Sequence, residues 1–174
     1  EVKFTGRRKN IEDLDSLPFP AYEKLEGFPE KYKLPIFSYP RAPGTVIISS
    51  RGCPYQCAYC DRSVFERSFR FHSPDYIVEL MKFLNTKFGI RHVNFYDDLF
   101  AFNKKRIIEI CEKILASGLK MTFNCAARSE HLDEDILSNL KRAGCWMISL
   151  GIESGDMELL NRHRSNSKLE TINA

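Results

Sequence analysis

Three cysteines stand close together between Ser50 and Cys60. Cys53, Cys57 and Cys60 have the spacing C-x3-C-x2-C and follow the apolar, β-branched run 45–49. That run predicts a buried strand, so the cysteines fall on the loop that leaves its carboxyl end. Iron–sulfur clusters are normally held by four cysteine thiolates. Three thiolates within eight residues therefore predict a cluster in which one iron keeps an open coordination position.

Three other uses of these cysteines compete with the cluster. A structural zinc site needs four ligands, usually in two separated pairs, and the sequence has no second C-x2-C. His72 is the nearest candidate for a fourth zinc ligand. A disulfide needs an oxidising compartment and would leave one of the three cysteines unpaired. Inert core cysteines would not normally cluster behind an Arg-Gly turn, so the spacing favours the iron–sulfur cluster.

After residue 72 the pattern becomes regular. Helices are predicted from Ser73-Pro74 to Gly89, from Asn103 to Gly118 and from Asp133 to Gly144, because each begins with a capping residue and ends in glycine. A further helical region begins at Leu159. The alternating or apolar runs 91–96, 120–125 and 146–151 predict three more strands. Four strand–helix units in alternation indicate an α/β fold with a parallel sheet.

Polar residues follow each of these strands, where a buried core would not favour them. Because the carboxyl ends of parallel strands share one edge, the residues that follow them should gather beside the cysteines. The candidates after the second, third and fourth strands are Asp97, Asp98, Asn124, Arg128, Ser149, Glu153 and Ser154. Simpler explanations exist for several of them: the two aspartates could end a strand, and Arg128 could pair with Glu130 at the surface. Cys111 and Cys145 occupy apolar positions typical of core cysteines, whereas Cys125 is ambiguous.

The string Arg51–Cys60, RGCPYQCAYC, with Tyr59 directly before the third cysteine, resembles the signature of the radical S-adenosylmethionine superfamily. It is most similar to the branch whose members often carry an N-terminal cobalamin-binding domain. The resemblance runs from about Leu14 to the end of the chain. It implies a partial (β/α) TIM-like barrel with about four βα units here, preceded by an irregular arm.

This resemblance also implies a chemistry. Cys53, Cys57 and Cys60 would hold a 4Fe–4S cluster, and the amino and carboxylate groups of S-adenosylmethionine would bind the fourth iron. An electron from the reduced cluster would cleave S-adenosylmethionine to methionine and a 5′-deoxyadenosyl radical, which abstracts hydrogen from a small-molecule substrate. Methyl transfer and ring formation are the outcomes that this branch suggests. An electron donor such as flavodoxin or ferredoxin is expected as a partner.

The resemblance also implies which residues of this chain contact S-adenosylmethionine. Asp98, with Asp97, would meet the amino group of S-adenosylmethionine, and the segment Asn124 to Arg128 would supply an arginine for its carboxylate. Glu153, in the segment Gly151–Gly155, would face the ribose hydroxyls. Tyr59 would lie near the adenine. The sequence has no Asp-x-His-x-x-Gly signature, so any cobalamin would be held by a domain outside this chain.

The first 44 residues differ from the rest of the chain. Six prolines punctuate residues 18–43 and exclude long helices, so residues 1–44 are predicted to be a linker or arm and residues 45–174 the N-terminal part of the core domain. Glu1 is not a methionine, which suggests a piece of a longer protein. The fourth strand would then expose an edge, and we expect self-association there unless the arm covers it.

Composition narrows the function classes. With 43% hydrophobic and 28% charged residues, 174 residues predict one soluble domain. A net charge of +3 gives no reason to expect nucleic acid. No stretch is apolar enough to span a bilayer and no signal peptide is visible. Six cysteines, three of them clustered, fit a reducing cytoplasm, which is the expected location. A radical methylthiotransferase acting on tRNA or protein, and a zinc-binding interaction module without catalysis, remain the alternatives.

Overall fold

The computed structural model describes residues 2–6, 8–35, 38–61, 63–65 and 68–164. The strands are β1 (Gly44–Ile47), β2 (Ser50–Arg51), β3 (Arg70–Phe71), β4 (His92–Phe95), β5 (Thr122–Ala127) and β6 (Cys145–Leu150). The α-helices are α1 (Pro74–Phe88), α2 (Lys104–Ala116), α3 (Glu134–Arg142) and α4 (Met157–His163). None of the described helices is both long and apolar enough to cross a membrane.

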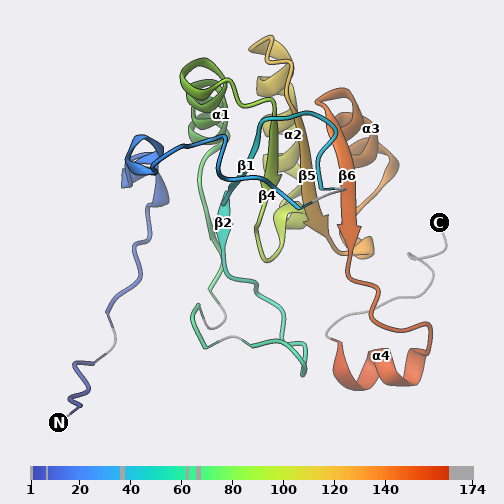
Figure 1. Ribbon diagram of the computed structural model, residues 1–174. Coiled ribbons are helices and arrows are strands. Elements are labelled where there is room, and N and C mark those ends of the chain that lie inside the picture. The colour runs from blue at the N-terminus through green and yellow to red at the C-terminus, as the bar shows by residue number, and fades with distance from the viewer. Residues whose placement is uncertain (1, 7, 36–37, 62, 66–67, 165–174) are drawn as a thin grey trace.

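A four-stranded parallel sheet forms the centre of the molecule (Figure 1). Its order is β1-β4-β5-β6, and each neighbouring pair is parallel. The predicted alternation of strands and helices is confirmed, with shifts at some strand boundaries. The third strand, for example, covers Thr122–Ala127 instead of 120–125. The small antiparallel pair of β2 and β3, which the sequence patterns did not predict, brackets the cysteine segment.

The helices begin at the residues predicted as caps. Ser73 and Asn103 accept hydrogen bonds from Tyr76 N and Arg106 N, and Asp133 accepts one from Ile136 N. These side chains satisfy backbone N–H groups that have no partner inside a helix. Helix α1 ends at Phe88, and Gly89 after it caps the last turn in a left-handed conformation. Local capping residues thus set where these three helices begin.

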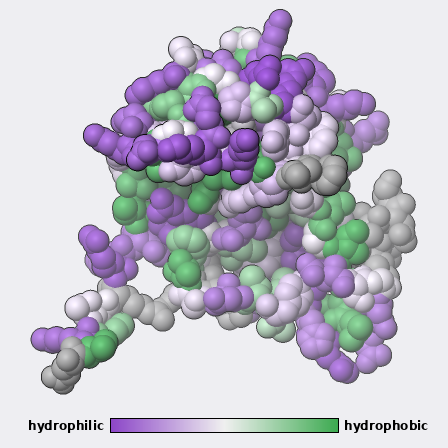
Figure 2. Space-filling view, viewed as in Figure 1, coloured by the Kyte–Doolittle hydropathy of each residue, from purple (hydrophilic) through white to green (hydrophobic). Residues whose placement is uncertain are grey.

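The hydrophobic core lies between the sheet and helices α1, α2 and α3. Along β1 and just after it, Ile47 is 3% exposed, whereas its neighbours Val46 and Ile48 are 37% and 53% exposed. This alternation shows that one face of the sheet packs on the helices and the other does not. In Figure 2 hydrophobic residues lie across the middle of the molecule, below a mostly hydrophilic upper part.

The proline-rich arm packs on the domain instead of extending into solvent along its whole length. Leu14 and Tyr22 are buried, and Phe28 packs edge-on against Phe88 of α1. Further along, the backbone oxygen of Ser38 accepts a hydrogen bond of 2.6 Å from Asn124 Nδ2 on β5. The arm therefore contacts both a helix and the sheet, and in Figure 1 its last part crosses in front of the strands.

Two glycines that follow helices differ in their surroundings and provide a test of this packing. Gly118 (φ 70°) and Gly144 (φ 101°) both adopt a positive φ. A Cβ on Gly144 would lie 2.6 Å from Met121 O, whereas one on Gly118 would meet nothing within 4 Å. We expect Gly144→Ala to lower the free energy of unfolding by about 1–3 kcal/mol, and more than Gly118→Ala does. Urea unfolding of both variants measures this, and equal losses would contradict the packing at Gly144.

Candidate functional site

The carboxylate of Asp97, at the end of β4, lies buried beneath the start of the cysteine segment. It accepts hydrogen bonds from Ser49 N (2.6 Å), Ser49 Oγ (2.5 Å) and Ser50 Oγ (2.8 Å). Burial raises the pKa of Asp97, while the bonds from both serines and the charge of Arg106 oppose that rise. Asp97 thereby fixes the point where the chain leaves β1 for the cysteines.

Arg106 of α2 closes the same segment from the other side. Its Nη2 donates to Ser49 O and its Nε donates to His72 O, both at 3.0 Å. One buried guanidinium therefore joins the residues that precede and follow the cysteine segment. His72, the sequence candidate for a fourth zinc ligand, pairs through Nδ1 with Asp15 at 3.0 Å and stacks on Tyr76. The His72 ring therefore contacts Asp15 of the arm and Tyr76 of α1.

The residue before the first cysteine needs to be glycine. Gly52 has a φ of 85°, and a Cβ there would lie 2.1 Å from Ser68 O. Its N–H donates to Asp98 Oδ2 at 3.1 Å. Asp97 and Asp98 therefore contact successive parts of one loop, the first in the interior and the second at the surface. Of the two, only Asp98 lines the pocket that contains the cysteines.

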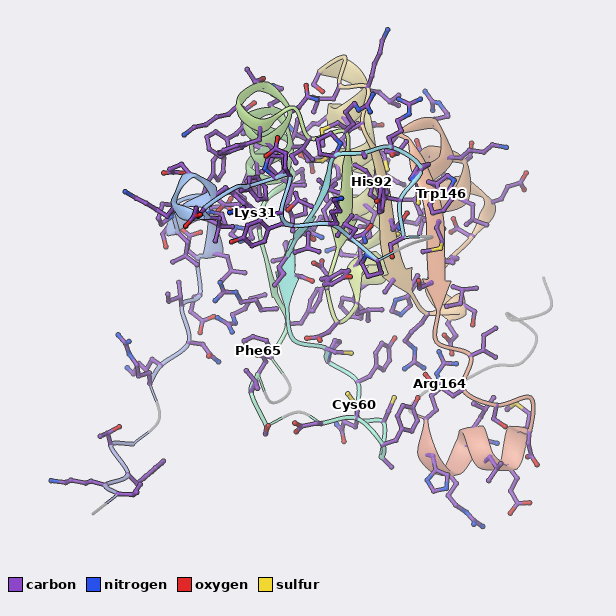
Figure 3. The ribbon with its side chains drawn as sticks, viewed as in Figure 1. Lys31, Cys60, Phe65, His92, Trp146 and Arg164 are labelled. Atoms are coloured by element: carbon purple, nitrogen blue, oxygen red, sulfur yellow. The ribbon has the colours of Figure 1, made fainter. Side chains whose placement is uncertain are left out.

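The three cysteine thiols line one pocket of about 380 Å³ at the carboxyl edge of the sheet. Cys57 is buried, Cys53 is half-buried and Cys60 is exposed, and all three are free thiols. Burial raises the pKa of the Cys53 thiol, and the neighbouring Cys57 and Cys60 raise it further. The three groups therefore lie close enough together to influence one another. Figure 3 shows Cys60 on the loop below the sheet.

The predicted site residues divide between this pocket and its neighbour. The pocket with the cysteines also contains Tyr59, Asp98, Arg128, Ser149 and Glu153. Asp97 and Asn124 line an adjoining hollow on the sheet, which shares Ser149 with the first pocket. Ser154 lines neither of these two pockets, and its hydroxyl accepts a hydrogen bond from Asp156 N at 3.0 Å.

Glu153 has an unusual backbone. It is the one non-glycine residue with a positive φ, 69°, among those that the structure describes. Side chains other than glycine adopt this conformation at a cost of about 1–3 kcal/mol, and such residues gather at functional sites. The strain at Glu153 agrees with a functional position for its carboxylate.

Three residues of the site, Tyr55, His131 and Arg164, were missed by sequence reasoning, and Tyr55 and Arg164 line the pocket. The expected pair of Arg128 and Glu130 is present, but both side chains are largely buried instead of lying at the surface. His131 Nε2 lies 2.6 Å from Tyr55 Oη. Arg164 follows α4, whose last residue accepts a hydrogen bond of 2.7 Å from Ala58 N in the cysteine loop. The position of Tyr55 between two cysteines was the one available signal.

The donor set fits an iron–sulfur cluster. No group of three or more His, Cys, Asp or Glu side chains in the described part of the chain converges on a single ion position. The cysteines of a four-iron cluster bind different iron atoms, so they need not converge on one point. Three cysteines in one pocket that Asp98, Arg128 and Glu153 also line suit a cluster with one open iron and a zwitterionic ligand beside it.

A parallel α/β domain that gathers three thiols at the carboxyl edge of its sheet defines a cofactor-binding domain of the iron–sulfur type. Residues 47–174 match the Radical SAM superfamily, and the chain belongs to that family. Membership implies a 4Fe–4S cluster and S-adenosylmethionine as cofactors. The resemblance carried by RGCPYQCAYC is thus confirmed.

Two known proteins illustrate the relationship in sequence. An uncharacterized methyltransferase of Pyrococcus horikoshii is 33% identical over 161 residues, which cover 92% of this chain and 34% of the relative. An anaerobic magnesium-protoporphyrin IX monomethyl ester cyclase of Synechocystis is 29% identical over 170 residues, or 94% and 34% of the two chains. This chain therefore spans about a third of the length of these relatives.

A solved structure confirms the fold. The cobalamin-dependent S-adenosylmethionine radical enzyme OxsB, with aqua-cobalamin and S-adenosylmethionine bound, has a TM-score of 0.66 and 27% identity to this chain. The match covers 72% of this chain and 20% of OxsB. The prediction of a partial radical SAM barrel is confirmed by this likeness together with the parallel sheet.

The two neighbouring aspartates should differ sharply in their effect on stability. Asp97→Ala removes three hydrogen bonds and one of the two carboxylate charges that act on buried Arg106, so we expect the free energy of unfolding to fall by about 3–5 kcal/mol. Asp98→Ala loses one contact at the surface and should cost about 1 kcal/mol or less. Urea unfolding of both variants measures the difference. Similar losses for the two variants would contradict the buried role of Asp97.

Proposed function

We propose that this chain is the part of a radical S-adenosylmethionine enzyme that binds the 4Fe–4S cluster and S-adenosylmethionine. The observation that carries the proposal is the pocket that Cys53, Cys57 and Cys60 line together with Asp98 and Glu153. When bound, the two cofactors supply a 5′-deoxyadenosyl radical for hydrogen abstraction. The protein's own contribution is to hold the three thiols, orient the cofactor and shield the site.

Most of the predicted site residues have a role in this proposal. Asp98 accepts a hydrogen bond from Gly52 N through one oxygen and has the other available for the amino group of S-adenosylmethionine. Glu153 accepts hydrogen bonds from the ribose hydroxyls, and exposed Tyr59 covers the adenine. Asn124 and Ser149 face the adjoining hollow, on the side where a substrate would meet the cofactor. Asp97 positions the loop.

Methyl transfer or ring formation on a small molecule is the reaction class that we propose for the whole protein. Its support is the nature of the relatives, a methyltransferase and a cyclase, and the cobalamin that OxsB binds. Cobalamin would be held by a segment outside this chain. A one-electron donor such as flavodoxin or ferredoxin, in the cytoplasm, would reduce the cluster.

Self-association through the sheet edge belongs to the same proposal. Strand β6 is the last strand of the sheet, and Trp146 on it is 47% exposed. An open edge with apolar side chains favours pairing with another strand. Either a second copy of this chain or a further segment of the whole protein would satisfy that edge.

Iron analysis tests the cluster. Anaerobic reconstitution with iron and sulfide should give about four irons per chain, with a brown chromophore. Replacing Cys53, Cys57 or Cys60 by alanine should abolish it, because each thiol holds a different iron. Cys111→Ala and Cys145→Ala, in cysteines outside the pocket, serve as controls and should keep it. Stoichiometric zinc without iron uptake would refute the proposal in favour of a zinc module.

Glu153 provides a test of the cofactor pocket. Glu153→Gln removes the charge but keeps a non-glycine side chain at this strained position, so the backbone cost is unchanged. Losing a charge-assisted hydrogen bond should weaken S-adenosylmethionine binding about ten- to a hundredfold, with the iron content intact. Equilibrium titration of the reconstituted protein measures the affinity. Glu158→Gln on α4, whose partner is exposed Arg162, is the matched control, and equal affinities in both variants would exclude this role.

A further inference from the structure

The guanidinium of Arg128 lies against one of the cluster ligands. Arg128 follows β5 and is 8% exposed, and its Nη1 is 3.6 Å from the Sγ of Cys57. Cys57 is itself 8% exposed. A buried positive charge at this distance from a thiolate acts through little intervening water, so its electrostatic effect is strong.

Protein groups hold this guanidinium in place. The guanidinium carbon, Cζ, lies 4.0 Å from the ring centre of Tyr55, which is a cation–π contact. Its Nε and Nη2 donate to the two carboxylate oxygens of Glu130 at 3.4 and 3.3 Å. Tyr55 Oη is in turn 2.6 Å from His131 Nε2. The direction of Arg128 toward Cys57 is therefore set by the chain itself.

Glu130 is shared between two arginines. Besides Arg128, it contacts Arg164 Nη1 at 3.5 Å through the same Oε1. Burial raises the pKa of Glu130, but the hydrogen bonds and charges of its neighbours, with Arg128 the largest of these, lower it on balance. Glu130 carries a negative charge that partly offsets the field of Arg128 at the cysteine loop.

We propose that Arg128 is a positioning residue that raises the reduction potential of the cluster through Cys57, and that Glu130 moderates this effect. The inference rests on the proposed function and adds a role that is independent of S-adenosylmethionine. The step concerned is the uptake of one electron from a one-electron donor, which takes the cluster from its 2+ to its 1+ state without proton transfer at Arg128. The added negative charge spreads onto the thiolates, where a cation and a hydrogen-bond donor favour it.

This role makes different predictions from a contact with the carboxylate of S-adenosylmethionine. A carboxylate contact affects the affinity for S-adenosylmethionine and has no effect on the cluster when the cofactor is absent. A contact with Cys57 changes the reduction potential in the absence of S-adenosylmethionine. The two charges around Cys57 also have opposite signs, so removing each one should move the potential in opposite directions.

The experiment is a redox titration of the reconstituted chain without S-adenosylmethionine, followed by electron paramagnetic resonance of the reduced cluster. Arg128→Gln should shift the one-electron equilibrium at least tenfold toward the oxidised form, about 59 mV. Glu130→Gln should shift it toward the reduced form. Arg142→Gln, an exposed arginine in the last turn of α3, is the control and should leave the potential unchanged.

The possible outcomes separate the two proposals. If the chain without substitutions takes up no iron, the proposed function is overturned and this inference with it. If the unchanged chain forms a cluster and its potential equals that of Arg128→Gln, this inference alone is overturned. Lower potentials in both Arg128→Gln and Glu130→Gln would overturn it as well. If Arg128→Gln assembles no cluster, Glu130→Gln decides: a raised potential supports the inference and an unchanged one refutes it.

Discussion

The buried carboxylate of Asp97 is the interaction on which the rest of the site depends. An ionised carboxylate inside a protein is costly unless hydrogen bonds and an opposite charge compensate for it. Asp97 receives three hydrogen bonds from Ser49 and Ser50, and the charge of Arg106 lies nearby. Arg106 then binds the backbone on both sides of the cysteine segment. The end of β4, the end of β1 and helix α2 are thereby joined at one polar centre beneath the loop.

Above this centre, the cysteine loop needs little regular structure of its own. Gly52 makes the close approach to Ser68 O, and Asp98 accepts the Gly52 N–H. Helix α4 binds the loop from the other side through Ala58 N. The loop is thus supported by three separate parts of the chain, and its thiols face the carboxyl edge of the sheet, where α/β proteins place their ligands.

Local signals in the sequence predicted the elements well. The caps at Ser73, Asn103 and Asp133 mark the true helix starts, because capping depends on hydrogen bonds within a few residues. Strand ends were less accurate, because register depends on neighbouring strands. The β2–β3 pair was missed since two-residue strands leave no periodic pattern.

The site was predicted only in part, because some of its contacts depend on residues far apart in the sequence. The cysteines lie close in sequence, and strand topology brings Asp98, Arg128 and Glu153 to the same pocket. The distinction between Asp97 and Asp98 could not be predicted, because it depends on which carboxylate turns inward. The contact between Arg128 and Cys57 joins residues 71 positions apart, and no local pattern records such a pairing.

We propose that the three cysteines leave one iron of the cluster open to S-adenosylmethionine. Electron paramagnetic resonance of the reduced, reconstituted chain, recorded with and without S-adenosylmethionine, tests it most directly. We expect a signal from a reduced 4Fe–4S cluster whose g-values change when S-adenosylmethionine is added, because the ligands of one iron change. A cluster signal that stays the same at saturating S-adenosylmethionine would contradict the claim.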